Sequence, residues 1–200
     1  ARSRSRGDAA CVRRAWVVVC VLALCSGAAF GDVVGGAQKI SNSYGGLSSY
    51  YTLDADDRFG ISVAAIGDLN GDGVADLAVG AHLDDDGSSN AGAVYVLFQD
   101  TSGAVVGAQK ISNSHGGLSS YYTLDAQDRF GRSVAAIGDL NGDGVADLAV
   151  GAYGDDDGGS SAGAVYVLFQ DTSGAVVGSQ KISNSHGGLS SYYTLDAGDE

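Results

Sequence analysis

Two short stretches of the chain place oxygen-bearing side chains at a spacing that suits a metal ion. Each stretch has a carboxylate or an amide at positions 1, 3, 5 and 9, and glycine at position 6. The side chains are Asp68, Asn70, Asp72 and Asp76 in the first stretch and Asp139, Asn141, Asp143 and Asp147 in the second. Calcium takes six to eight hard oxygen ligands, and neighbouring carboxylates repel one another unless a cation neutralises them. The pattern predicts two Ca²⁺ sites, each completed by the backbone carbonyl at position 7, of Val74 or Val145.

An EF-hand and a metal-free acidic turn are two other interpretations of these stretches. An EF-hand requires glutamate at position 12 of its loop, but Val79 and Val150 stand there. The flanking residues also have the composition of strands, whereas an EF-hand lies between helices. An acidic hairpin turn without a metal is the remaining alternative. A calcium loop between two strands explains the paired occurrence best.

The loops belong to a longer internal repeat. The pentapeptide at residues 36–40 recurs at 107–111 and, with one change, at 178–182, so the period is 71 residues. Units 36–106 and 107–177 differ at seven positions, and residues 178–200 begin a third unit. Such periodicity indicates an architecture built by stacking one supersecondary unit.

Each unit is predicted to contain four short strands, since its apolar runs are rich in valine, alanine and aromatic residues. In the first unit they cover residues 59–66, 76–81, 93–98 and 105–112, and turn-forming runs separate them. Four antiparallel strands per repeat are the blade of a β-propeller. We therefore expect an all-β fold, with residues 113–128 as a surface loop between blades. A β-helix or solenoid usually has a shorter repeat.

A known family shares these motifs. Arg58-Phe59-Gly60, the acidic loop and Val79-Gly80-Ala81 together resemble an FG-GAP repeat of the integrin α-subunit type, and residues 129–131 and 150–152 repeat the pattern. The resemblance implies propeller blades that hold calcium in hairpin loops on one face, bind a ligand on the other and pack against neighbouring blades of a longer chain. The proline that often follows the second motif is absent, because His82 and Tyr153 stand there.

The N-terminal region has the pattern of a secretory signal. Five arginines within the first 14 residues precede a short apolar run at 15–25, and small residues follow it. We expect residues 1–31 to be a signal peptide and residues 32–200 to be a secreted or cell-surface repeat fragment. An uncleaved anchor is the alternative. The three cysteines lie in this N-terminal region, so no disulfide can cross-link the repeats to one another.

The charge of the repeat region limits the possible partners. From residue 32 onward there are 23 acidic and 6 basic residues, which disfavours nucleic acid and anionic lipid. The three histidines occur singly, and Asp84–Asp86 and Asp155–Asp157 suit solvated loops. We expect a non-enzymatic, extracellular module that binds protein or glycan in cell adhesion, without membrane insertion of the mature repeat region. The alternative is a non-catalytic propeller attached to a secreted enzyme.

Overall fold

The computed structural model describes residues 37–196, and all of them lie in one compact unit. The expected signal peptide at 1–31 lies outside the described residues. Between residues 37 and 196, no helix is long and apolar enough to cross a membrane.

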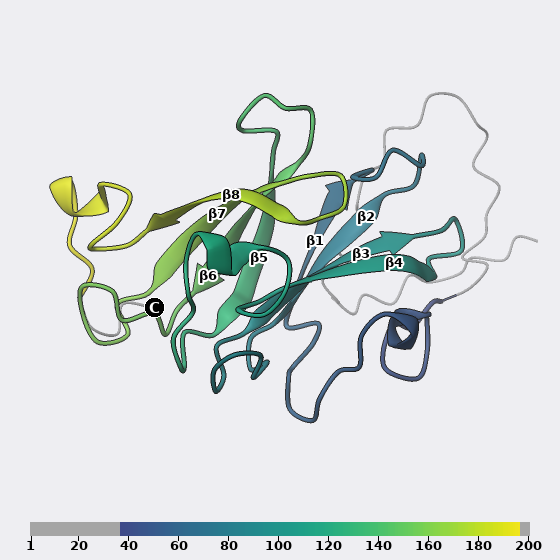
Figure 1. Ribbon diagram of the computed structural model, residues 1–200, viewed down its shortest axis with the longest axis horizontal. Helices are drawn as coiled ribbons and strands as arrows, with labels where there is room; N and C mark the ends of the chain where they lie inside the picture. Colours follow the sequence, from purple (N-terminus) through teal and green to yellow (C-terminus); the bar gives the residue numbers. More distant parts are fainter. Residues whose placement is uncertain (1–36, 197–200) are drawn as a thin grey trace, which may run out of the picture. The chain divides into compact units, whose positions relative to one another are not determined.

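The described residues form two four-stranded antiparallel sheets (Figure 1). The strands of the first sheet are β1 (Ser62–Gly67), β2 (Asp76–Ala81), β3 (Ala93–Gln99) and β4 (Val105–Ile111), and those of the second are β5 (Phe130–Gly138), β6 (Asp147–Ala152), β7 (Ala164–Gln170) and β8 (Val176–Ile182). In both sheets the strands follow one another in chain order. This is the arrangement of a propeller blade, so the expected all-β fold is confirmed.

The two sheets differ where their first strands begin. β5 starts at Phe130, which pairs with Ala152 and also forms a bridge to Gly92, the residue before β3. β1 starts only at Ser62, three residues later than expected for the first unit. The later start follows from the missing neighbour, because Phe59 has no counterpart of Gly92 to pair with among the described residues.

The sheets pack closely through small residues. A Cβ on Gly80 of β2 would lie 1.9 Å from the carbonyl oxygen of Gly131 in β5, so no side chain fits at this position. One hydrophobic core spans the contact, since Val94 and Val96 of β3 belong to the same cluster as Leu148 and Tyr166 of the second sheet. Burial of this apolar surface is the main force that holds the two units together.

The segment between the sheets was expected to be a surface loop, but it is partly buried. Its 3₁₀ helix η2 (Leu118–Ser120) and the residues around it place Leu118 and Leu124 in the core. Val176 of β8 donates its N–H to the Gly116 carbonyl at 2.8 Å. The segment therefore packs as part of the second unit. Its Gly116 carbonyl also satisfies a backbone N–H of the edge strand β8, and unpaired backbone groups on an edge strand would favour pairing with another chain.

The same segment occurs in each unit. The 3₁₀ helix η1 (Leu47–Ser49) packs on β4 in the first unit, and Val105 donates its N–H to the Gly45 carbonyl at 2.8 Å. A third copy, η3 (Leu189–Ser191), follows β8. Tyr192 and Tyr193 next to η3 are exposed.

Candidate metal loops

The two acidic stretches form the hairpin loops that connect β1 to β2 and β5 to β6. In each loop the residues at positions 1, 3 and 5 are exposed, the valine at position 7 is half-buried, and the aspartate at position 9 is buried as the first residue of the next strand. A β-bulge lies at the end of β1 and of β5, where the chain leaves the sheet. The same local sequence therefore folds the same way twice.

The first aspartate of each loop organises the turn by accepting backbone hydrogen bonds. Asp68 Oδ1 accepts from the N–H groups of Gly71 and Asp72 at 2.8 and 2.9 Å, and Oδ2 accepts from Gly73 at 2.8 Å. Asp139 makes the same three bonds in the second loop, at 2.7, 3.0 and 2.8 Å. Short polar side chains stabilise tight turns in this way.

The middle residues of the loop bind one another. The Asn70 amide donates to Asp72 Oδ2 at 2.9 Å, and Asp72 Oδ1 accepts from the N–H of Val74 at 2.8 Å. Asn141, Asp143 and Val145 repeat these contacts, each at 2.8 Å. Gly71 and Gly73 have φ of 81° and 87°, a conformation that glycine adopts without strain.

The last aspartate connects the loop to the sheet. Asp76 Oδ2 accepts from the N–H of Leu69 at 3.0 Å, and Oδ1 accepts from the N–H of Gln99, at the end of β3, at 3.1 Å. Asp147 makes the equivalent bonds to Leu140 and Gln170. Burial raises the pKa of Asp76, the backbone bonds oppose this change, and the charge of Asp72 adds to it. These bonds connect the loop between β1 and β2 to the end of β3, and the loop between β5 and β6 to the end of β7.

Within residues 37–196, no three His, Cys, Asp or Glu side chains gather closely enough to hold a metal ion. The loop carboxylates cap backbone amides instead, so the side chains at positions 1, 5 and 9 do not converge on one point. The donor chemistry nevertheless fits a hard cation. A carboxylate has about four acceptor positions, and the bonds above use three on Asp68 and two on Asp72. The Gly71 and Gly73 side of the loop is open, because a Cβ at either would meet no atom within 4 Å.

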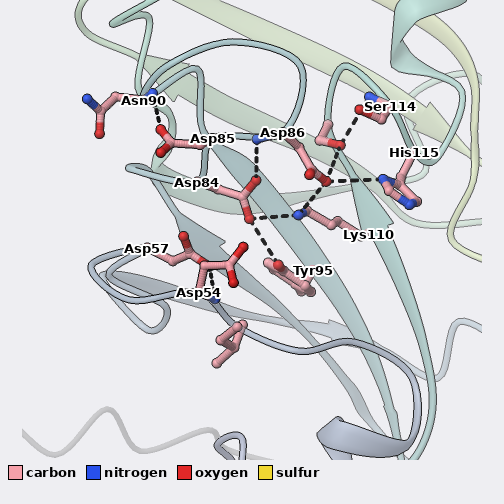
Figure 2. Close-up of polar contacts among 12 residues, drawn as sticks. Asp54, Asp57, Asp84, Asp85, Asp86, Asn90, Tyr95, Lys110, Ser114 and His115 are labelled. Atoms are coloured by element: carbon pink, nitrogen blue, oxygen red, sulfur yellow. Dashed lines mark hydrogen bonds and ion pairs between the residues drawn. The ribbon is translucent and has the colours of Figure 1, made fainter.

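A second polar cluster lies inside each unit, and Figure 2 shows the cluster of the first unit. Lys110 on β4 contacts Asp84 at 2.7 Å and Asp86 at 2.5 Å, and the Tyr95 hydroxyl donates to Asp84 at 3.0 Å. His115 lies 3.1 Å from Asp86. In the second unit Lys181, Asp155, Asp157, Tyr166 and His186 take the same positions. Asp84 and Lys110 are both buried, so the expectation of solvated Asp84–Asp86 and Asp155–Asp157 loops was wrong for the first aspartate of each.

The electrostatics of this cluster follow from burial and pairing. Burial alone would lower the pKa of Lys110, but the hydrogen bonds that Lys110 donates to Asp84 and Asp86, together with the charges of these two residues, outweigh burial and raise the pKa. Burial raises the pKa of Tyr95, and the Asp84 charge raises it further. In the second unit, burial is the main cause that raises the pKa of Asp128, which lies near Asp155, to about 7. The cluster joins the β2–β3 loop to β4.

Sequence reasoning missed the buried cluster because its members are distant along the chain. The available signal was the lysine inside an apolar strand of an acidic protein, at Lys110 and Lys181. A buried lysine requires a carboxylate partner, and the nearby aspartate triplets supply one. The aromatic partner follows only from register, since Tyr95 pairs with Lys110 across β3 and β4.

The repeats match a known family. The FG-GAP repeat model matches residues 59–97 and 130–168. Integrin alpha-2 of Bos taurus is 40% identical over 99 residues, covering 48% of this chain and 8% of the relative. Integrin alpha-M of Mus musculus is 38% identical over 97 residues, with coverage of 48% and 8%. Integrin alpha-10 of Homo sapiens is 42% identical over 120 residues, with coverage of 60% and 9%.

The two matches of the family model cover β1, β2 and most of β3 in the first sheet, and β5, β6 and most of β7 in the second, with the hairpin loops between them. The chain spans less than a tenth of the length of these curated relatives, so the comparison concerns only a small part of each relative. The strand order, the duplicated loops and the matched residues agree with one another. Two segments of the chain thus match the FG-GAP repeat, and about half of the chain is similar to integrin α-subunits.

Proposed function

We propose that this chain is part of an extracellular, calcium-binding β-propeller module that binds a protein or glycan ligand in cell adhesion. The module is secreted or lies at the cell surface and performs no catalysis. Its relatives are integrin α-subunits by name, and the charge of the repeat region favours cations over nucleic acid.

The observation that carries the proposal is the duplicated acidic hairpin. Both copies connect the first two strands of a sheet, and both keep every oxygen donor at positions 1, 3, 5 and 9. In the first site, Asp68, Asn70, Asp72, Asp76 and the Val74 carbonyl would hold the ion. In the second site, Asp139, Asn141, Asp143, Asp147 and the Val145 carbonyl would do so.

The ion would neutralise the loop carboxylates and stiffen the hairpin. Asp76 already binds the backbone at the end of β3, so a cation held by this residue would also fix the loop relative to the sheet. A rigid set of loops on one side of a blade is a suitable base for ligand binding by neighbouring loops. Calcium therefore acts structurally in this proposal.

Calorimetric titration with CaCl₂ tests the metal sites. We expect two sites in the parent chain and one site in Asp72→Ala, because each loop is a separate chelator. Asp100→Ala is the matched control. Asp100 is a half-buried aspartate that also caps its own turn, by accepting from the N–H groups of Ser102 and Ala104, but it lies outside the acidic loops. Two unchanged sites in Asp72→Ala would refute the ligand role of this residue, and no binding to the parent chain would refute the calcium proposal.

A further inference from the structure

Each acidic loop contains an asparagine that is directly followed by a glycine. The pairs are Asn70-Gly71 and Asn141-Gly142, and all four residues are exposed. Asparagine is a chemically labile residue, because the backbone nitrogen of the next residue can attack its side-chain carbon. A glycine nitrogen attacks most easily, since glycine has no Cβ to obstruct the approach. The two pairs are therefore positions at which the chain can modify itself.

A carboxylate already binds the N–H group that must lose its proton in this attack. Asp68 Oδ1 accepts from the Gly71 N–H at 2.8 Å. In the second loop, Asp139 Oδ1 accepts from the Gly142 N–H at 2.7 Å. A general base must lie within about 2.6–3.2 Å of the atom that it deprotonates. Each loop therefore contains the nucleophile, the amide that it attacks and a base in reach of the nucleophile.

The other asparagines of the described residues have a different environment. They precede serine or alanine and are Asn42, Asn90, Asn113 and Asn184. The Asn113 side chain accepts from the Leu124 N–H and donates to the Leu124 carbonyl, both at 2.7 Å. Its equivalents at 42 and 184 make the same pair of bonds. Such bonds hold the amide against a distant part of the backbone, whereas the Asn70 amide binds Asp72 within its own exposed loop.

We propose that each acidic loop deamidates itself in the folded chain, at Asn70 in the first loop and at Asn141 in the second. In the first loop, Asp68 takes the proton from the Gly71 nitrogen, and this nitrogen forms a bond to the side-chain carbon of Asn70. The carbon–nitrogen bond of the amide breaks, and its nitrogen receives the proton and leaves as ammonia. Water then opens the resulting succinimide ring to aspartate or isoaspartate. The second loop reacts in the same way.

Both products disturb the hydrogen bonds that shape the loop. Asp72 Oδ2 accepts from the Asn70 amide at 2.9 Å, and a carboxylate in place of the amide cannot donate this bond. Two neighbouring carboxylates also repel one another. Isoaspartate adds a methylene group to the backbone just before Gly71 and so displaces its N–H from Asp68. Deamidation thus changes the charge and the shape of the loops slowly and irreversibly, whether or not they bind calcium.

Peptide mapping by mass spectrometry tests the proposal on the 200-residue chain, stored at neutral pH in EDTA. The same chain unfolded in guanidinium chloride provides the reference rate, because it keeps each Asn-Gly pair but not the position of the base. We expect isoaspartate and the mass gain of deamidation at Asn70 and Asn141, at least as fast as in the unfolded chain. Asn113 should remain an amide. Slower reaction of the folded loops than of the unfolded chain, or equal conversion at Asn113, would overturn the proposal.

A substitution in one loop separates the base from the Asn-Gly pair. Asp68→Asn keeps an oxygen that can accept from the Gly71 N–H but has no carboxylate to take the proton. Conversion at Asn70 should therefore slow by at least about tenfold. Asn141 in the same molecule is the internal control and should keep its parent rate.

A second variant controls for the loss of charge and for damage to the loop. Asp72→Ser removes a carboxylate from the same loop but leaves Asp68 in place, so conversion at Asn70 should not slow. An unchanged rate at Asn70 in Asp68→Asn would contradict the role of Asp68. Equal slowing in the two variants, or slowing at Asn141 as well, would show that the effect does not come from the base and would also overturn the proposal.

Discussion

Burial of a single carboxylate affects the free energy of unfolding, and Asp128 is the clearest case. Its Oδ2 accepts a hydrogen bond from the Asp125 N–H at 2.8 Å. Burial nevertheless raises the pKa of Asp128 to about 7, and the charge of Asp155 adds to this effect. The folded state thus keeps a proton that the unfolded state has already released above pH 3.8, the ordinary value.

The sign of the pH dependence follows from this difference. Between pH 4 and pH 7 the folded chain binds more protons at Asp128 than the unfolded chain does, so stability falls as the pH rises. Asp128→Asn is neutral throughout and keeps an acceptor for the Asp125 N–H. We expect the variant to show a smaller loss of unfolding free energy between pH 5 and pH 8, and higher stability at pH 8, in urea melts.

A control with the opposite pKa shift tests the cause. Hydrogen bonds from Ser173 and Ala175 hold the pKa of Asp171 below its usual value, against the opposing effect of burial. Asp171→Asn should therefore leave the slope between pH 5 and pH 8 unchanged, since its titration lies at lower pH. Parallel pH profiles for the parent and Asp128→Asn would contradict the assignment.

At this scale the sequence indicated residue types better than residue contacts. Positions 1, 3, 5 and 9 of the acidic loops were recognisable because their spacing is local. Their hydrogen bonds to backbone amides were not, since these depend on the path of the turn. The Lys110 cluster was missed because Asp84 and Tyr95 reach the lysine only after β3 and β4 pair.

The strands were easier to predict where their signal was local, as a short apolar run between turn-forming residues. β2 was predicted at its observed bounds, and the ends of β3 and β4 differ from expectation by one residue. The start of β1 was wrong because pairing with a neighbouring unit, not local composition, decides it. The segment at 113–128 was misjudged for a related reason, since its polar residues conceal two leucines that enter the core.

The linking segment supplies a prediction with an internal control. Leu118 of η2 is fully buried in the shared core, whereas its equivalent Leu189 of η3 is half-buried. Leu118→Ala should cost about 2–5 kcal/mol of unfolding free energy, from lost burial and the cavity left behind. Leu189→Ala should cost clearly less in the same urea titration. Equal costs would show that η2 does not contribute to the core as argued.

The whole molecule is dominated by negative charge. Its formal net charge is −13, and an acidic loop connects the first two strands of each sheet. Self-repulsion of this kind destabilises the compact state. Bound cations would reduce it and also add binding energy to the folded state, because the paired flanking strands keep the oxygen donors of each loop near one another only in the folded chain.

Thermal unfolding of the whole chain therefore depends on calcium if the proposed sites are real. A ligand that binds only the folded state stabilises it by about 2.7 kcal/mol per site at 100 times its dissociation constant. For a chain of this size each kcal/mol shifts the melting temperature by roughly 2–4 °C. We expect a clear rise in melting temperature in CaCl₂ relative to EGTA, measured by circular dichroism. The Asp72→Ala/Asp143→Ala double variant should show no such rise, because both loops then lack a ligand. Coincident curves for the parent chain in the two buffers would refute a stabilising calcium ion, while an equal rise in the double variant would place the bound ion outside these loops.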